Sequence, residues 1–176
     1  MNKQDTPTRL VESMPSRRTV LGAGGAVGLT LLNPSSIFAQ GADGANTIRV
    51  GFISPRTGAL ASFGEADGYV LELARKALAG GITAGGKKYA VEILDRDTQS
   101  DPGRASQLAK TLINVDKVDL VLVTSAPETV NPVADACEGA GVPCLSTVTP
   151  WEAWYFGRGA KPGEPSPFKW TFHFSF

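Results

Sequence analysis

The most regular feature of the chain, from Ile48 onward, is an alternation of short apolar runs with longer segments whose apolar residues recur at helical spacing. A short apolar run predicts a buried strand, whereas recurrence at every third or fourth position predicts an amphipathic helix. This pattern predicts helices over 66–78, 102–113 and 130–137, and strands over 48–53, 89–94, 118–123 and 142–146. Such alternation predicts an α/β fold, a doubly wound parallel sheet with right-handed crossovers.

The last part of the chain has a different pattern. Four aromatic residues crowd together between Trp151 and Phe156, and a loop rich in glycine and proline follows over 157–167. Residues 169–176 then alternate strictly, which predicts a further strand with His173 on the side opposite to the aromatic residues. Because no cap follows this apolar strand, we expect a truncated domain whose open edge invites association.

Residues 1–39 have the pattern of an export signal. Arg17-Arg18 precedes a weakly apolar core rich in glycine, and Ala39 ends the segment at a possible cleavage site. The core is shorter than the roughly 20 apolar residues of a membrane-spanning helix. A disordered basic tail is the alternative. We expect residues 1–39 to be a twin-arginine signal that directs the protein to the periplasm, and 40–47 to be a linker.

Three glycines inside this leader imitate a dinucleotide-binding fingerprint. Gly22, Gly24 and Gly28 have a similar spacing, but that motif follows a buried strand, and here basic residues precede the glycines. We reject this interpretation and expect no cofactor.

Charge excludes one class of partner. Without residues 1–39, the chain loses four of its 17 basic and two of its 17 acidic residues, which leaves 13 against 15. A net charge near −2 provides no basic face for nucleic acid. The remaining residues are enough for one domain with a real core.

The two cysteines, Cys137 and Cys144, fit no metal-binding or redox motif. In an oxidising compartment they could form a disulfide. Their predicted places, a helix end and the next strand, are equally consistent with two buried free thiols. Both possibilities stay open.

Three loops follow predicted strands at one edge of the sheet, where ligands of such sheets bind. These loops are 54–64, 124–129 and 147–151. Hydroxyl groups beside the free N–H groups of a helix start could hold a carboxylate, although helix capping is the simpler interpretation. Aromatic side chains could form apolar walls, or they could pack in the core. The predicted ligand-binding residues are Phe63, Ser125, Ala126, Thr129, Thr147, Thr149 and Trp151.

Catalytic chemistry is not indicated. Asp95 and Asp97 suggest a phosphoacceptor or a metal site, but a receiver domain has its acidic pair after the first strand, so a solvated strand end is the better interpretation. No nucleophile and base can be paired, and Ser54 lacks the glycines of a nucleophile elbow. We therefore expect neither an enzyme nor a metal site.

A series of short motifs has a characteristic order along the chain: Ile48–Ser54, Thr57-Gly58, Phe63-Gly64, Gly80-Gly81-Ile82, Gly86-Lys87, Glu92 with Asp95, Asp101-Pro102, and Asn131-Pro132 ahead of Gly141-Val142-Pro143. This order, together with the leader, resembles the periplasmic solute-binding proteins of ABC transporters, specifically the branched-chain amino acid (Leu/Ile/Val-binding) family.

The resemblance implies a two-lobed clamshell that closes on a solute, of which this chain matches only the first lobe of a type I periplasmic binding protein. It places the family's bulky aromatic residue on Phe63, its carboxylate-binding loop on 125–129 and a second hydroxyl loop on 147–151. Pro127 and Glu128 are departures, because amino-acid binders tend to carry Ser or Thr there. The ligand is therefore expected to extend beyond amino acids to an amide or an aromatic acid.

We expect residues 48–176 to be the N-terminal lobe of an extracytoplasmic receptor. It would capture an amino acid or similar small organic solute and deliver it to the membrane permease of an ABC transporter. One alternative is a ligand-sensing domain of a receptor or regulator with the same fold. A flavodoxin-like enzyme is the other, although the phosphate-binding glycines it needs after the first strand are not found.

Overall fold

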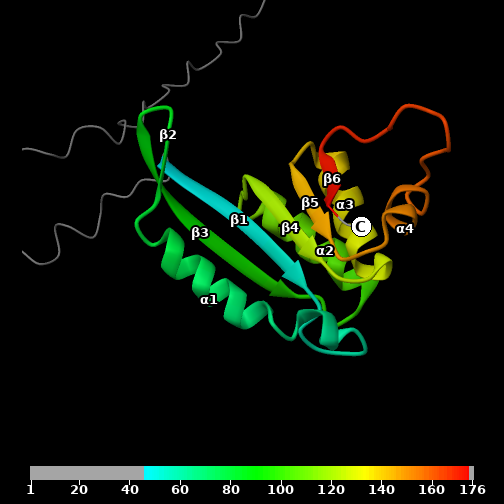
Figure 1. The fold of residues 1–176 in the computed structure, drawn as a ribbon, viewed down its shortest axis with the longest axis horizontal. Coiled ribbons are helices and arrows are strands. Elements are labelled where there is room, and N and C mark those ends of the chain that lie inside the picture. Colours follow the sequence, from blue (N-terminus) through cyan, green and yellow to red (C-terminus); the bar gives the residue numbers. More distant parts are fainter. Residues whose placement is uncertain (1–45, 175–176) are drawn as a thin grey trace, which may run out of the picture. The chain divides into compact units, whose positions relative to one another are not determined.

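The computed structural model describes residues 46–174, and a six-stranded sheet lies at its centre (Figure 1). The strands are β1 (Thr47–Ser54), β2 (Ile82–Ala84), β3 (Lys87–Asp97), β4 (Leu120–Thr124), β5 (Cys144–Thr147) and β6 (Thr171–Phe174). They lie in the order β2-β3-β1-β4-β5-β6. All neighbours are parallel except β2, which is antiparallel to β3.

Helices connect these strands. They are the 3-10 helix η3 (Ala61–Gly64) and the α-helices α1 (Asp67–Leu78), α2 (Pro102–Asn114), α3 (Pro127–Ala140) and α4 (Trp151–Tyr155). From β1 the chain passes through α1 to β3 on one side, and from β3 it passes through α2 to β4 on the other side of β1. The predicted α/β doubly wound parallel sheet is confirmed, and so is a strand within 169–174.

Local signals explain where several elements begin and end. The Asp101 side chain caps α2 by accepting from the N–H of Arg104, with Pro102 at the first helical position. Gly141 ends α3 with φ of 70°, a left-handed conformation that glycine adopts without steric cost. The predicted helix over 102–113 begins at the same residue as α2, whereas α3 begins before and ends after the predicted helix over 130–137.

Three elements were not predicted: the 3-10 helix η3, the strand β2 and the helix α4. Gly85 and Gly86 have φ of 55° and 77° and form a two-residue turn between β2 and β3, as in a tight hairpin. All three residues of β2 are exposed, so the strand has no apolar pattern that a sequence analysis could detect. The helix α4 is short and follows directly on Pro150.

The core lies between the sheet and the pair α2 and α3, which pack together on one face (Figure 1). Ile53, Val121 and Val123 project from the central strands and are at most 1% exposed. They meet Leu112 of α2 and Val133 of α3, which are fully buried. This face has the close packing expected of a parallel sheet covered by helices.

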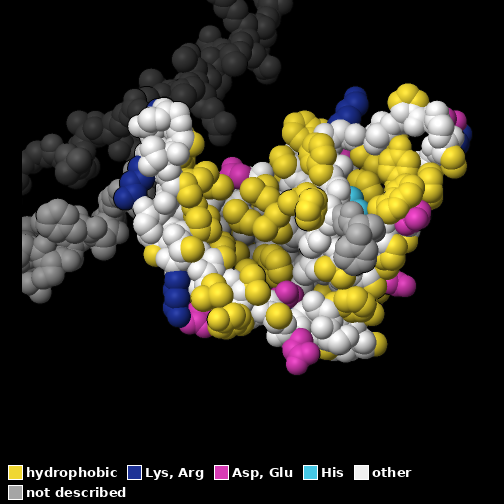
Figure 2. Space-filling view, viewed as in Figure 1, with side chains coloured by type: hydrophobic (Ala, Val, Ile, Leu, Met, Phe, Trp, Pro, Cys, Tyr) yellow, Lys and Arg dark blue, Asp and Glu magenta, His cyan; other side chains and the backbone are white. Residues whose placement is uncertain are grey.

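The other face of the sheet is only partly covered, because α1 packs on β3. Strand register places Phe52, Leu122, Leu145 and Phe172 in one row across β1, β4, β5 and β6. Leu145 is 44% exposed, Phe172 58% and Phe174 77%. Figure 2 shows hydrophobic side chains gathered on this face over the central strands. The apolar runs predicted buried strands, and in the described part of the chain β5 and β6 are buried on one face only.

The predicted export signal and linker, apart from residues 46 and 47, lie outside the described residues. Within residues 46–174, no helix has the length and apolar character needed to cross a bilayer.

Candidate functional site

The loops after β1, β4 and β5 lie at one edge of the sheet, because these three strands are parallel and adjacent. This is the edge to which the arrows of β1 and β4 point in Figure 1. It is also the edge where doubly wound sheets bind ligands. The site lies where the connections that leave two adjacent strands run in opposite directions, here from β1 towards β3 and from β4 towards β5. The structure therefore brings together the three loops predicted from the sequence.

The loop after β1 is fixed by two side chains from the β3–α2 connection. Asp97 accepts hydrogen bonds from the N–H of Arg56 at 2.9 Å and from the Thr57 hydroxyl at 2.7 Å. The Ser100 hydroxyl donates to the carbonyl of Thr57 at 2.7 Å and accepts from the N–H of Leu60 at 2.9 Å. Burial alone would raise the pKa of Asp97, but hydrogen bonds from Gln99, Thr57 and Arg56 hold it below its ordinary value. Asp97 thus orders the loop.

Asp95 is held between two guanidinium groups. Its carboxylate oxygens lie 2.7 Å from Arg56 and 2.7 Å from Arg75 of α1. Burial opposes ionisation, yet the hydrogen bond from Arg75 and the charges of both arginines lower the pKa of Asp95. No group of three metal-ligating side chains occurs in residues 46–174. Asp95 and Asp97, at the end of β3, thus form ion pairs and hydrogen bonds with neighbouring residues.

The loop after β4 contains Ser125, which is buried in an unusual backbone conformation. Its φ is 150°, and its hydroxyl has no hydrogen-bond partner among the described residues. Ala126 occupies the N-cap of α3 without a side-chain cap. The buried Thr129 hydroxyl donates to the carbonyl of Ala126 at 3.4 Å. The Thr129 hydroxyl is therefore engaged within the first turn of α3, whereas Ser125 leaves a polar group free beside the helix start.

The loop after β5 is strained and firmly held. Val148 has φ of 76°, which is costly for a β-branched residue. The buried Thr149 hydroxyl donates to the carbonyl of Ser125 at 2.6 Å, which joins this loop to the loop after β4. His173 of β6 lies with Nε2 2.7 Å from the carbonyl of Thr149 and Nδ1 2.8 Å from the Ser146 hydroxyl. His173 faces away from Phe172 and Phe174, as predicted.

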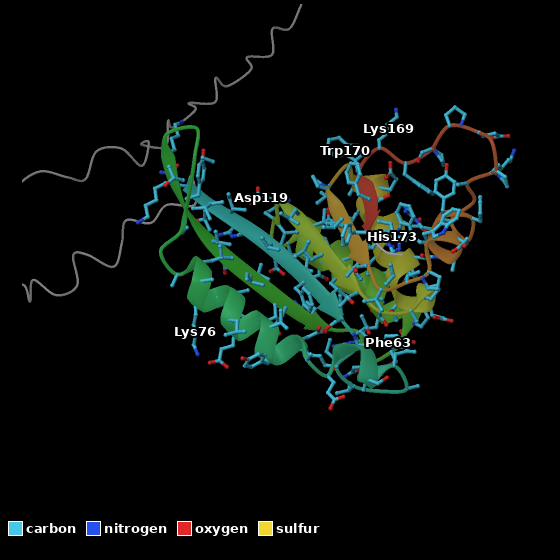
Figure 3. All side chains as sticks on the ribbon, in the orientation of Figure 1. Phe63, Lys76, Asp119, Lys169, Trp170 and His173 are labelled. Atoms are coloured by element: carbon cyan, nitrogen blue, oxygen red, sulfur yellow. The ribbon has the colours of Figure 1, made fainter. Side chains whose placement is uncertain are left out.

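Phe63 and Trp151 are each 45% exposed and do not belong to the buried core. Figure 3 shows Phe63 at the end of the sheet to which β1 runs. Trp151 begins α4, and its ring centroid lies 5.6 Å from that of Phe156. Thr147 is exposed at the end of β5. These side chains are accessible at or beside the three loops.

Ser54 belongs to the predicted loop 54–64 at this edge but was not included among the predicted ligand-binding residues. Its hydroxyl is buried at the end of β1 and has no partner among the described residues. A serine that ends the strand just before the candidate loop was the available signal. The positive φ of Val148 could not be predicted from the sequence, since valine is uncommon in that conformation.

An apolar groove of about 230 Å³ lies next to this edge on the open face of the sheet. Its lining comes from β1, β4, β5 and β6 and consists of Phe52, Leu122, Val123, Thr124, Leu145, Thr147 and Phe174. Thr147 is the one predicted ligand-binding residue in the groove, so most of the predicted residues lie elsewhere along the edge.

Comparisons with known proteins agree with this architecture. The model of the family described as "Periplasmic binding protein" matches residues 47–176. The chain therefore belongs to the periplasmic binding protein family, a family of solute-binding proteins. The predicted first lobe of a type I periplasmic binding protein is thereby confirmed.

Three solved structures illustrate the similarity. The branched-chain amino acid transporter substrate binding protein LivJ of Streptococcus pneumoniae, in complex with isoleucine, has a TM-score of 0.57 and 25% identity, over 72% of this chain and 33% of that one. A solute binding protein of an ABC transporter from Rhodopseudomonas palustris, in complex with 3,4-dihydroxy benzoic acid, has a TM-score of 0.56 and 26% identity, over 73% and 31%. A type 1 periplasmic binding protein of Bordetella pertussis has a TM-score of 0.56 and 25% identity, over 74% and 34%.

The chain thus spans about a third of the length of these three proteins. A comparison with curated protein sequences found no match.

Proposed function

We propose that this chain is the N-terminal lobe of a receptor that captures an amino acid or similar small organic acid outside the cytoplasm and delivers it to the permease of an ABC transporter. The observation that carries this proposal is the pair of buried, unpartnered hydroxyls of Ser54 and Ser125, one at each of two neighbouring loops. A buried polar group without a partner costs about 1–3 kcal/mol, so a ligand that supplies the missing hydrogen bond binds favourably.

The local chemistry favours a carboxylate. The helix α3 begins at Pro127, two residues after Ser125. The N–H of Thr129 donates to the carbonyl of Ala126 at 3.2 Å, so the N–H of Glu128 is the donor of the first turn that is left without a partner within the helix. Such a helix start attracts an anion through its N–H groups and its dipole. Glu128 in the first turn opposes this attraction, and Pro127 removes one donor. We propose that the hydroxyls therefore contribute more to binding than the helix start does.

Two neighbours indicate the range of ligands to test. Isoleucine and 3,4-dihydroxybenzoic acid, bound by the proteins from Streptococcus pneumoniae and Rhodopseudomonas palustris, both carry a carboxylate and differ in their apolar part. Phe63 and Trp151, each 45% exposed, would contact that apolar part in our proposal. Thr147 would border the same part from β5, and Ala126 would offer its backbone.

Thr149 and Thr129 have a supporting role in this proposal. Their hydroxyls donate to the carbonyls of Ser125 and Ala126 and are buried, so they would hold the binding loop in shape. No step of bond making or breaking is proposed, because capture requires only reversible contacts. We also propose export by the twin-arginine route, on the basis of Arg17-Arg18. Periplasmic accumulation that is unchanged when both arginines are replaced by lysine would contradict that route.

The test is titration of the isotope-labelled 176-residue chain with isoleucine and with 3,4-dihydroxybenzoate, followed by amide chemical shifts. One lobe leaves a ligand half solvated, so we expect weak binding, in the millimolar range, with shifts at Ser125 and Ala126. Ser125→Ala should weaken binding at least fivefold. The matched control Ser166→Ala alters an exposed serine in the 157–167 loop and should have no effect. Shifts confined to other regions, or conversion of either compound, would contradict the proposed function.

A further inference from the structure

The two cysteines of the chain are both buried on the covered side of the sheet. Cys137 lies in the last turn of α3 and is 0% exposed, and Cys144 is the first residue of β5 and is 1% exposed. Both belong to the hydrophobic core formed by the sheet with α2 and α3. They are free thiols in this structure, and the Cys137 thiol is near enough to Cys144 to raise the pKa of its thiol.

The connection between the two cysteines is short and well defined. The N–H of Val142 donates to the carbonyl of Cys137 at 3.0 Å, which turns the chain back immediately after α3. Gly141, at φ of 70°, makes this reversal possible. Cys144 is then fixed in the sheet, since its N–H donates to the carbonyl of Trp170 at 2.9 Å. The contact between the thiols thus follows from the fold of residues 137–144.

The surroundings of Cys144 favour its protonated thiol in the folded chain. The hydrogen bond from Cys137 and burial raise the pKa of the Cys144 thiol, and the charge of Arg158 acts in the opposite direction. The guanidinium of Arg158 is itself buried and lies 4.7 Å from the ring centroid of Trp154. Because the thiolate is the reacting form, exchange requires folding or a local opening during which the thiols meet water.

We propose that Cys137 and Cys144 form an intramolecular disulfide that links the end of α3 to the start of β5 when the chain folds in the presence of a disulfide oxidant. One cysteine thiolate attacks the oxidant and forms a mixed disulfide, which releases the first thiol of the oxidant. The second cysteine then attacks the protein sulfur of that mixed disulfide and releases the second thiol. The pair loses two electrons and two protons, and the oxidant disulfide is reduced to two thiols.

This inference does not depend on the identity of any solute. The spacing of the cysteines left this pairing open, and the fold adds that both side chains are buried in one cluster. The link would restrain a short loop in the unfolded chain, so its stabilisation should be moderate: an unfolding midpoint higher by roughly 5 °C.

The experiment is refolding of the full 176-residue chain in reduced and oxidised glutathione, compared with reduced glutathione alone. After denaturation, we expect no free thiol in the first sample and two in the second, which corresponds to both cysteines of the sequence. Glu138 lies between the cysteines, so a protease that cleaves after glutamate separates them. The two resulting peptides should remain joined until a reductant is added.

Single variants provide the controls. Cys137→Ala and Cys144→Ala should each retain one free or glutathione-blocked thiol, and a reductant should not change their unfolding midpoint. In the unaltered chain, reductant should lower the midpoint by roughly 5 °C. Two free thiols after oxidative refolding, a stable glutathione adduct on either cysteine, or a disulfide between two chains would each overturn the proposal.

Discussion

At the scale of single residues, backbone strain and unpartnered polar groups gather at the candidate binding edge. Ser125 has φ of 150° and Val148 has φ of 76°, and both lie in loops that follow central strands. Strain of this kind costs about 1–3 kcal/mol per residue and persists only where the surroundings enforce it. Here the enforcing contacts are those of Thr149 with Ser125 and with His173.

We predict that Val148→Gly stabilises the protein. Glycine adopts a positive φ without steric cost, and relief of strain should exceed the added entropy of the unfolded chain, for a net gain of about 0.5–1 kcal/mol. Urea unfolding measures this difference. The matched control is Val115→Gly, at an exposed position with φ of −102°, where the same change should destabilise by a similar amount. Equal effects at both positions would show that Val148 carries no strain.

His173 should be a positioning residue for the same loop. Nε2 donates to the carbonyl of Thr149, since a carbonyl can only accept, and Nδ1 lies at hydrogen-bond distance from the Ser146 hydroxyl. His173→Phe keeps an aromatic ring to stack on Trp154 but leaves the carbonyl of Thr149 unpaired, at a cost of about 1–3 kcal/mol. The Ser146 hydroxyl keeps its bond to the carbonyl of Phe172 at 3.2 Å. Chemical denaturation and amide shifts of Thr149 would report the change. Phe172→Leu, on the exposed side of β6, is the control and should cost less than about 0.5 kcal/mol.

At the scale of elements, β6 is attached to α3 through one carboxylate. Glu138 accepts hydrogen bonds from the N–H groups of Lys169, Trp170 and Thr171, at 2.8–3.1 Å, and from the Thr171 hydroxyl at 2.9 Å. Burial alone would raise the pKa of Glu138, but these four donors lower it below its ordinary value of 4.5. A charged acceptor thus fixes the position of β6 beside β5.

The stability provided by Glu138 should therefore depend on pH. The lowered pKa means that this contribution is complete above about pH 4.5 and is lost as the pH falls through the folded-state value. Glu138→Gln should destabilise by about 2 kcal/mol at pH 7, and the difference from the unaltered protein should diminish below pH 4.5. Unfolding at a series of pH values measures this. Glu65→Gln, at an exposed carboxylate, should show no such dependence; a constant difference for Glu138→Gln would contradict the assigned role.

Elements with strong periodic patterns were predictable, and those held by distant contacts were not. The stripe of α2 and the apolar run of β4 are local signals, so both elements appeared in the sequence analysis. The exposed strand β2 depends on its turn at Gly85 and Gly86 and on pairing with β3. The edge at which the candidate site lies could be predicted, because it depends only on the order of the strands along the chain. The unpartnered hydroxyl of Ser125 could not be predicted, because hydrogen-bond partners depend on packing between loops far apart in sequence.

At the scale of the whole molecule, the described sheet has one face buried under helices and an open face with exposed apolar side chains. The face covered by α2 and α3 contains the buried core, whereas the row from Phe52 to Phe172 is solvent-accessible beyond α1 (Figure 2). Parallel sheets are ordinarily covered on both faces. An exposed apolar face of this kind favours association.

We predict that the 176-residue chain self-associates through this open face as its concentration rises. Leu145 and Phe172 are neighbours in adjacent strands and are 44% and 58% exposed, so a second apolar surface would remove both from water. The double variant with Leu145→Lys and Phe172→Lys should shift the chain towards monomer in light scattering while its circular dichroism stays the same. Val115→Lys places the same charge on an exposed valine of 73% accessibility at the end of α2 and should leave association unchanged. A chain that is monomeric at all concentrations, or an equal effect of both substitutions, would show that the open face does not drive association.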